Sequence, residues 1–135
     1  MVVGDVMQTD EAAVAPVNIR VAADKSQVPM IRAIAETLAV LADFSLDEVA
    51  DIKLAVDEAA MTIIGGAAAG VELTVAFNAT EHSFHAVIQS WLPDAKTLPQ
   101  SGFGWHVLQT LTDSVTVHEG ETDGDGRLVA IELSK

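Results

Sequence analysis

A long amphipathic segment in the middle of the chain restricts the fold more than any other feature. Ser45 and Glu48 stand three residues apart in the pattern of a helix capping box. From there to about Ala68, apolar residues recur at helical spacing. The residues that share this apolar face are Val49, Ile52, Val56, Ala59, Ala60 and Ile63. The pattern predicts one long helix with a buried side.

The same segment has a second face that carries polar groups. At 100° per residue, Asp51, Ala55, Glu58 and Thr62 lie within about 60° of one another. A carboxylate that faces a cleft can take a proton from a hydroxyl group. An oxygen ligand one turn later could help to hold a hard metal such as magnesium. We call these four residues the polar stripe; an ordinary solvated helix face is the alternative interpretation.

Shorter periodic segments surround the long helix. Alternating apolar residues predict strands at 17–21, 71–77, 84–89, 114–118 and 127–133. One helix is expected from a cap at Asp24 or Ser26 to about Ala42, and another over 102–111. Turns are expected at 78–81 and 120–126, and a loop at 91–101. The predicted fold class is α+β, a two-layer α/β sandwich. Its mixed, mainly antiparallel sheet has about five strands, with three helices on one face.

The N-terminal stretch 1–15 shows no clean periodicity, and we expect a flexible tail there. Residues 16–135 then form one domain, the usual size for a single fold. No apolar run reaches the roughly 18 residues of a transmembrane helix, and no signal peptide is visible, so we expect a cytoplasmic protein.

The charge balance narrows the function classes. The chain has 7 Lys and Arg against 20 Asp and Glu, a formal net charge of −13. Such a balance argues against nucleic acid and against an anionic membrane as partners, because both are bound through basic side chains. Basic proteins fit better. The chain has no cysteine, which excludes a disulfide framework, a thiol nucleophile and a cysteine zinc site.

Two further groups of residues could carry chemistry. Ser101, Gly102 and Gly104 stand at a helix start, where glycines admit close approach and free N–H groups attract phosphate. A tight loop-to-helix junction is the simpler interpretation. The four histidines are not expected to form a metal-binding set, and His82 and His85 are expected to point to opposite sides of a strand.

The order of these motifs resembles a known family. A capped helix with LAVDEAAMTII, two strands, a loop and then SGFGWHVLQTLTDSVTVHEG follow one another in the chain. This arrangement is similar to the anti-sigma-factor serine-kinase branch of the GHKL (histidine-kinase-like) ATPase superfamily, most of all to actinobacterial RsbW-type proteins. The resemblance runs from about Val17 to Leu133. It implies a Bergerat-type fold with an ATP site between the helix layer and the loop.

The resemblance also implies roles for particular residues. Glu58 matches the glutamate that acts as general base, and Thr62 stands where the family has the asparagine that helps to hold Mg²⁺. Gly102 and Gly104 match the family's Gly-x-Gly at a helix start, next to Ser101. The adenine-reading Asp-x-Gly-x-Gly is not retained; its aspartate position falls near Ser90, with Asp94 farther along. We therefore expect binding of ATP and Mg²⁺ to be weak or lost.

The leading hypothesis is an anti-sigma factor with a degenerate ATP site. The implied partners are an alternative sigma factor of the stress or sporulation type, a STAS-type anti-anti-sigma protein and a second copy of the chain. Arg20, Lys25 and Arg32 are the basic residues near the surface where the family places its partner. The alternative is an active serine protein kinase that phosphorylates the STAS partner with Mg-ATP. A third possibility is a scaffold of the same fold that binds STAS proteins only. We expect Trp105 to pack in the core and to fill part of the nucleotide space.

Overall fold

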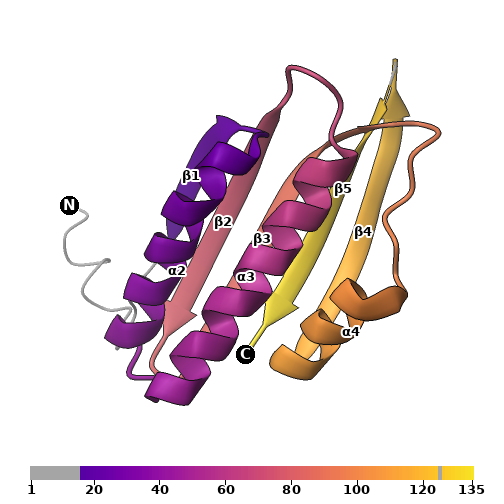
Figure 1. Ribbon diagram of the computed structural model, residues 1–135. Coiled ribbons are helices and arrows are strands. Elements are labelled where there is room, and N and C mark those ends of the chain that lie inside the picture. The colour runs from indigo at the N-terminus through magenta and orange to yellow at the C-terminus, as the bar shows by residue number, and fades with distance from the viewer. Residues whose placement is uncertain (1–15, 125) are drawn as a thin grey trace.

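A computed structural model describes residues 16–124 and 126–135; the predicted tail at 1–15 lies outside the described residues. Three α-helices and five strands follow in the order expected from the sequence (Figure 1). The helices are α2 (Val28–Leu41), α3 (Leu46–Gly66) and α4 (Gly102–Leu111), and a 3₁₀ turn, η1 (Lys25–Gln27), precedes α2. The strands are β1 (Val17–Ala22), β2 (Glu72–Thr80), β3 (Ser83–Pro93), β4 (Ser114–Asp123) and β5 (Gly126–Ser134).

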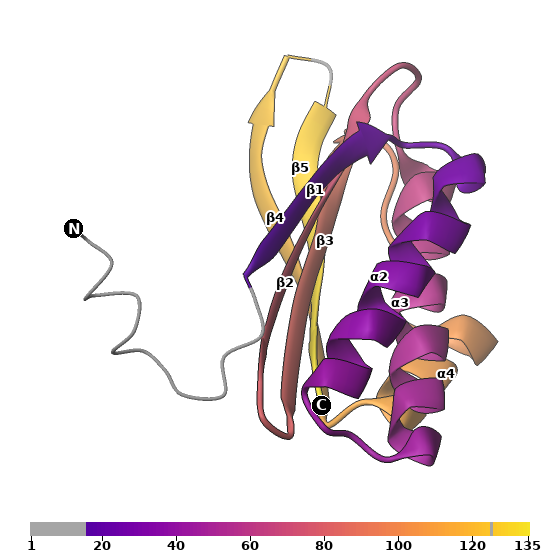
Figure 2. The ribbon, with the colours of Figure 1, turned by 90° about the vertical axis from the view of Figure 1, so that its left-hand side faces the viewer.

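The strands form one sheet in the order β1-β2-β3-β5-β4, and the four described strand pairs are all antiparallel. All three helices lie on the same side of this sheet, and its other face is open (Figure 2). The predicted two-layer α+β sandwich is thereby confirmed, with no parallel pair among the described strands. None of the described helices is both long and apolar enough to cross a bilayer.

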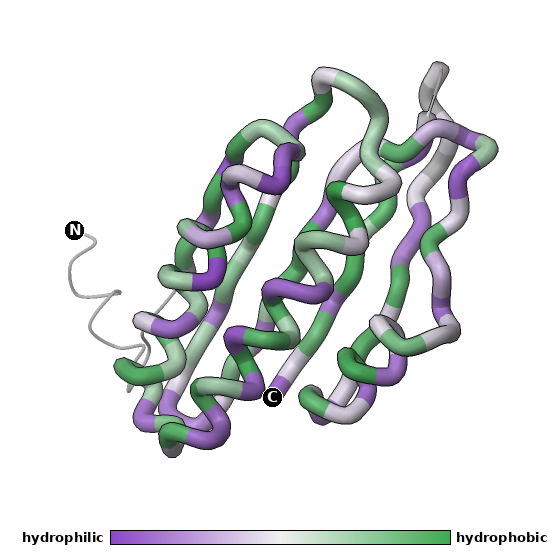
Figure 3. The backbone as a smooth tube through the Cα atoms, viewed as in Figure 1, coloured by the Kyte–Doolittle hydropathy of each residue, from purple (hydrophilic) through white to green (hydrophobic). Residues whose placement is uncertain are grey.

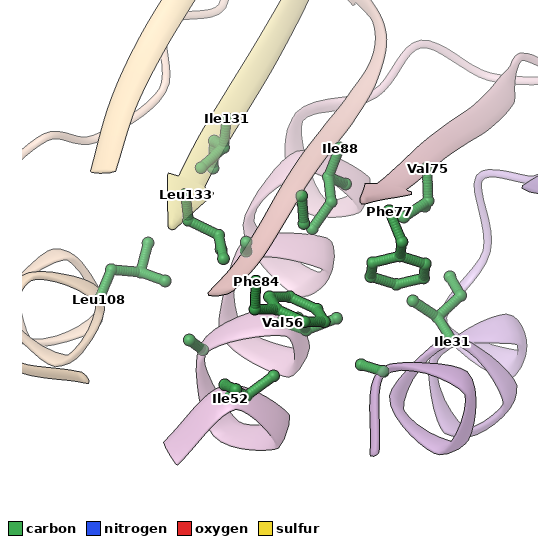
Figure 4. Packing of buried hydrophobic residues seen from close by; sticks show 14 of the residues in the cluster. Ile31, Ile52, Val56, Val75, Phe77, Phe84, Ile88, Leu108, Ile131 and Leu133 are labelled. Atoms are coloured by element: carbon green, nitrogen blue, oxygen red, sulfur yellow. The ribbon is translucent and has the colours of Figure 1, made fainter. Parts of the chain in front are cut away.

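The hydrophobic core fills the space between the two layers. Hydrophobic and hydrophilic residues alternate along α2 and α3 (Figure 3), so each helix turns one apolar side inward. Ile52 and Val56 of α3 point toward the sheet, where Phe84 and Leu133 meet them (Figure 4). Phe77 and Phe84 pack with their ring centroids 5.7 Å apart. The residues predicted for the buried face of the long helix are all buried.

Several boundaries differ from the sequence prediction because strands extend where a distant partner is available. Strand β3 continues to Pro93, beyond the predicted end at Gln89, because residues 91–93 pair with β5. The predicted loop at 91–101 is therefore shorter, covering 94–101. Strand β2 runs on to Thr80 and β4 to Asp123, into the segments expected to be turns at 78–81 and 120–126. The ladder between β4 and β5 has an irregularity between Glu119 and Thr122.

The long helix begins at the predicted capping box. Ser45 Oγ accepts a hydrogen bond from the backbone N–H of Glu48 at 3.2 Å, and the Ser45 N–H donates to Glu48 Oε1 at 2.9 Å. The hydrogen bond that the Ser45 N–H donates to the carboxylate, and next the neighbouring Ser45 side chain, lower the pKa of the Glu48 carboxyl group. The helix ends at Gly66, two residues before the predicted end, and the Ala68 N–H then donates to the Trp91 carbonyl of β3 at 2.8 Å.

Removing the cap should destabilise the whole protein, since α3 supplies much of the core. We expect Ser45→Ala to lower the free energy of unfolding by about 1 kcal/mol, because one N–H at the helix start loses its acceptor. Urea denaturation followed by circular dichroism measures the change. Ser26→Ala is the matched control, since Ser26 Oγ bonds only an exposed carboxylate of Asp24; equal losses in both variants would contradict the cap assignment.

The open face of the sheet carries a polar cluster that the sequence did not predict. His85 of β3 and His118 of β4 approach the same carboxylate, Glu132 of β5, with Nε2–O distances of 2.5 and 2.6 Å. The sequence analysis considered the histidines only as metal ligands and did not foresee this shared contact, which arises because the β3-β5-β4 order places their strands on either side of Glu132. His82 instead lies in the β2–β3 turn with φ of 62°, 3.8 Å from an oxygen of Asp43.

The histidine contacts should make the contribution of Glu132 to stability depend on pH. The hydrogen bond from His85, and then that from His118, lowers the pKa of Glu132 in the folded protein. A lowered folded-state pKa stabilises the protein above the unfolded value and ceases to do so as pH falls through the folded value. The difference in unfolding free energy between wild type and Glu132→Gln should therefore be constant above about pH 5 and shrink below about pH 4.5.

Denaturation curves of both proteins from pH 3 to 7 measure this difference. In a His85→Ala background the shrinkage should be smaller, because the larger cause of the lowered pKa is absent. A difference that stays constant down to pH 3 would contradict the assignment.

Candidate functional site

The structure brings the predicted base and the predicted glycine motif together. Glu58 lies in the middle of α3, and Gly104 lies in the first turn of α4, which packs beside α3 (Figure 1). A Cβ atom at Gly104 would overlap with Oε2 of Glu58. Glycine is therefore required at this position for the carboxylate to stay where it is. Two motifs that are 46 residues apart in the sequence thus form one local site.

The polar stripe is not a solvated face, because α4 packs against it. Ala55 is fully buried, and Asp51, Glu58 and Thr62 are half-buried. The Thr62 hydroxyl donates to the Glu58 carbonyl at 2.8 Å and lies 3.4 Å from Glu58 Oε2. The hydroxyl proton is thus engaged within its own helix turn. Only the remaining lone pairs of Thr62 are free to accept or to ligate.

The start of α4 has the backbone conformation that its glycines allow. Gly102 has φ of 87°, in the left-handed region that disfavours any side chain. Ser101 occupies the N-cap position in extended conformation, and its side chain makes no capping bond. The first N–H groups of α4 are therefore not occupied by this side chain. Trp105 is half-buried and packs against the core, as predicted, while Phe103 beside it is exposed.

A small groove lies between the second half of α3 and the loop that leads to α4. Its volume is about 270 Å³. Its walls are Met61, Thr62, Gly65 and Gly66 of α3 and residues 96–99 of the loop. Small-molecule sites usually measure roughly 300–1,000 Å³, so this groove is at or below the lower limit. Trp105 is not part of its lining, which leaves the idea that it fills nucleotide space without support.

Apolar side chains occupy the inner end of this groove. Leu98 is 6% exposed and belongs to the hydrophobic core. A Cβ atom at Gly66 would come within 3.0 Å of Leu92 and 3.6 Å of Leu98. The loop is therefore packed down on the end of α3. Lys96 is the one cationic residue in the lining of the groove.

Thr62 alone among the predicted binding residues lines the groove; Ser101, Gly102 and Gly104 stand at the start of α4, and the remaining two lie elsewhere. Ser90 is 2% exposed, and its hydroxyl donates to the Glu72 carbonyl of β2 at 2.6 Å. This side chain joins two strands and is not directed at a ligand. Asp94 is exposed at the start of the loop, and neither residue lines the groove with Thr62.

The three predicted partner-binding residues do not form one surface. Arg32 of α2 donates to Asp57 of α3 at 2.7 Å and so joins the two helices. Arg20 lies on β1, with its Nε 3.8 Å from Glu72. Lys25 is exposed in η1. Of the three, Arg32 thus has a structural partner within the helix layer.

Two further ion pairs join α3 to its surroundings. Lys53 lies 3.4 Å from Glu36, and Lys135 lies 3.2 Å from Asp51 and donates to the Leu111 carbonyl at the end of α4. Within the described chain, one trio of Asp, Glu and His ligand atoms lies within 4.8 Å of one another: Asp43, Glu81 and His82. All three are exposed where α2 joins α3, at the opposite end of α3 from the groove. None of these three residues is therefore placed to bind a metal ion together with Glu58.

One residue near the site was missed by the sequence analysis. Arg127, expected only as the first residue of a strand, is 8% exposed and hydrogen-bonded to the backbone of the loop. The alternation of β5 would have placed it on the buried face, together with Val129, Ile131 and Leu133. That signal was available in the sequence.

The fold agrees with comparisons to known proteins. Residues 21–132 match the model of the histidine kinase-like ATPase domain, so the chain belongs to that family. The chain is also similar to the anti-sigma-F factor RsbW of Mycobacterium tuberculosis, in strains CDC 1551 / Oshkosh and H37Rv. Each match is 28% identical over 120 residues and covers 87% of this chain and 71% of the relative. The resemblance inferred from the motifs is confirmed.

The contact between Glu58 and Gly104 can be measured with a double-mutant cycle. Alanine is favoured over glycine inside a helix by up to about 1 kcal/mol. In a Glu58→Ala background, we expect Gly104→Ala to raise the free energy of unfolding by that amount. When Glu58 is present, the increase should be smaller by at least about 0.5 kcal/mol, because the carboxylate must move. Unfolding free energies of the four proteins give the coupling.

Gly65→Ala is the control for this cycle, since a Cβ there meets nothing within 4 Å. Its effect should be the same with and without Glu58. A cycle for Gly104 that is additive within about 0.3 kcal/mol would mean that the two groups do not touch.

Proposed function

We propose that this protein is an anti-sigma factor that acts by sequestering an alternative sigma factor of the stress or sporulation type. The main support is the similarity to an anti-sigma-F factor over 87% of the chain, together with the family fold. The proposed counterpart that releases the sigma factor is a STAS-type anti-anti-sigma protein. We place this activity in the cytoplasm, where sigma factors meet RNA polymerase.

The charge of the chain supports a basic protein partner. A net charge of −13 favours encounter with a positively charged surface and disfavours nucleic acid. Sigma factors carry basic surfaces toward DNA. Opposite charges accelerate association and select the partner, while packing of apolar side chains holds the complex together. The proposed capture should therefore become slower as salt is added.

We further propose that the nucleotide site is degenerate. ATP carries about four negative charges, which require counter-charges when they leave water. The groove offers Lys96 alone, its volume is about 270 Å³, and its inner end is closed by Leu98. Thr62 replaces the asparagine of the family, and Ser90, near the adenine-reading position, is bonded to β2. Each of these features weakens the case for tight binding of ATP and Mg²⁺.

We also propose that two copies of the chain associate. The open face of the sheet supports this, since no described element covers it (Figure 2). Trp91, 36% exposed at the end of β3, lies on that open side. A half-exposed aromatic side chain on an uncovered sheet is typical of an interface residue.

An active serine protein kinase is the second candidate. The observation that favours it is the contact between Glu58 and Gly104, because the base and the glycine turn of the family are retained side by side. In that case Glu58 would take the proton of a serine hydroxyl on the STAS partner. Thr62 would help to hold Mg²⁺, and the N–H groups at the start of α4 would face the phosphates.

Two measurements on the same purified protein test the leading proposal. We expect it to retain one of the organism's alternative sigma factors in a pull-down at physiological salt. We also expect Mg-ATP at millimolar concentration to leave the melting temperature nearly unchanged. A nucleotide at 100 times its dissociation constant would add about 2.7 kcal/mol to stability. Retention of no sigma factor would end the anti-sigma proposal.

The kinase alternative has its own readout. Radiolabelled ATP, the protein and a purified STAS antagonist are incubated together, with Glu58→Gln as the matched variant. Phosphate transfer that disappears in Glu58→Gln would establish the kinase and overturn the degenerate site. Absence of transfer, combined with an unchanged melting temperature, supports sequestration alone.

A further inference from the structure

The buried arginine of β5 stands where the loop between β3 and α4 covers the sheet. Arg127 lies on the helix-facing side of β5, at the end of the column formed by Val129, Ile131 and Leu133. At this end of β5, the chain that leaves β3 crosses the sheet before it descends to α4 (Figure 1). Arginine is rarely buried to 8% exposure without partners, so its contacts need an explanation.

The guanidinium group of Arg127 holds the first part of this loop by its backbone. Nη1 donates to the Pro93 carbonyl at 3.2 Å and to the Asp94 carbonyl at 2.9 Å, and Nη2 donates to the Lys96 carbonyl. The Lys96 N–H also donates to the Pro93 carbonyl at 2.9 Å, which closes a tight turn over 93–96. Three carbonyl groups of one turn thus converge on a single side chain.

A carboxylate balances the buried charge. Glu119 of β4 faces Arg127, with its Oε1 3.3 Å from Nε. A buried guanidinium with no opposite charge would be strongly destabilising. The pair joins three segments: the end of β3, the irregular part of β4 and the start of β5. Lysine could not replace arginine here, because a single ammonium lacks the planar array of five donors.

We infer that Arg127 is a positioning residue that fixes the 93–96 turn, and with it the wall of the groove, without any ligand. The turn leads directly into residues 96–99, which line the groove opposite α3. Arg127 and the buried Leu98 hold this segment at two points, one polar and one apolar. The loop that would close over a nucleotide in a binding site is here ordered by a cation of the protein itself.

This inference goes beyond the proposed function, because the loop is held in the same way whether or not the protein captures a sigma factor. It concerns the shape of the groove in the free protein. Its test therefore needs neither a partner protein nor a nucleotide, and it can fail while the anti-sigma proposal stands.

Limited proteolysis with trypsin reads out the loop directly. The carbonyl that Arg127 Nη2 binds belongs to the Lys96–Thr97 peptide bond, which trypsin cleaves only after the loop opens. We expect Arg127→Met to raise the rate of cleavage after Lys96 at least tenfold. Cleavage after Lys53, inside α3, reports general unfolding in the same digest. The ratio of the two rates should rise at least tenfold.

Matched variants distinguish loss of the hydrogen bonds between Arg127 and the loop from loss of overall stability. Glu119→Gln keeps the arginine but removes its counter-charge, and we expect an intermediate rise in the ratio. Arg127→Lys should resemble Arg127→Met more than wild type. Arg20→Met, which removes an exposed arginine of β1, should match wild type. Hydrogen exchange of the Lys96 amide should accelerate in the same order as the cleavage rates.

Two results would overturn the inference. One is cleavage after Lys96 that is unchanged in Arg127→Met. The other is a rise that only parallels cleavage after Lys53, which would make Arg127 a residue of general stability. If Arg127→Met does not fold, Glu119→Gln and Arg127→Lys decide by the same ratio.

Discussion

Burial of one face of α3 against the central strands is the interaction on which the rest of the structure depends. Ile52, Val56 and Ile63 are at most 2% exposed, and they meet the inward side chains of β3 and β5. Burying each such side chain contributes roughly 1.5–3 kcal/mol relative to exposure. With this face fixed to the sheet, the flanks of α3 can point only toward α2 on one side and α4 on the other. The candidate site is on the second flank.

The site follows from that orientation and from small residues at two places. Glu58 is carried on the α4 side of α3, and Gly104 lets the two helices come close enough for carboxylate and backbone to touch. At the end of α3, Gly66 does the same for Leu92 and Leu98. The first approach places the two residues that match the family motifs next to each other. The second brings the loop down onto the end of the helix, where Leu98 forms part of the wall of the groove.

Periodicity and local motifs were sufficient to predict the fold. Local sequence patterns predicted the capping box at Ser45 and the buried face of α3. They also predicted the order of the elements and the single helix layer. The ends of the strands could not be predicted in this way, because β3 extends to Pro93 only through its pairing with β5. The same reason explains the histidine cluster: no local pattern shows that β5 lies between β3 and β4.

The candidate site was predicted in part, for equally physical reasons. Glu58 and Gly104 were identified because family motifs at set spacing are visible in one sequence. The polar stripe was expected to face a cleft or solvent, since nothing local shows that α4 packs on it. Arg127 was overlooked because a single basic residue at a strand end is usually exposed. Its role depends on carbonyl groups 31 to 34 residues away, which meet it only after the sheet has formed.

The hydroxyl of Ser90 restricts which side chains can replace it. It serves as a donor to a main-chain oxygen of the neighbouring strand, in a place closed to water. An aspartate introduced there would set one acceptor against another, with no solvent to separate them. An acidic group at position 90 would thus demand a rearranged junction of β2 and β3 beforehand. The pairing of the two strands and the identity of this side chain are therefore tied to each other.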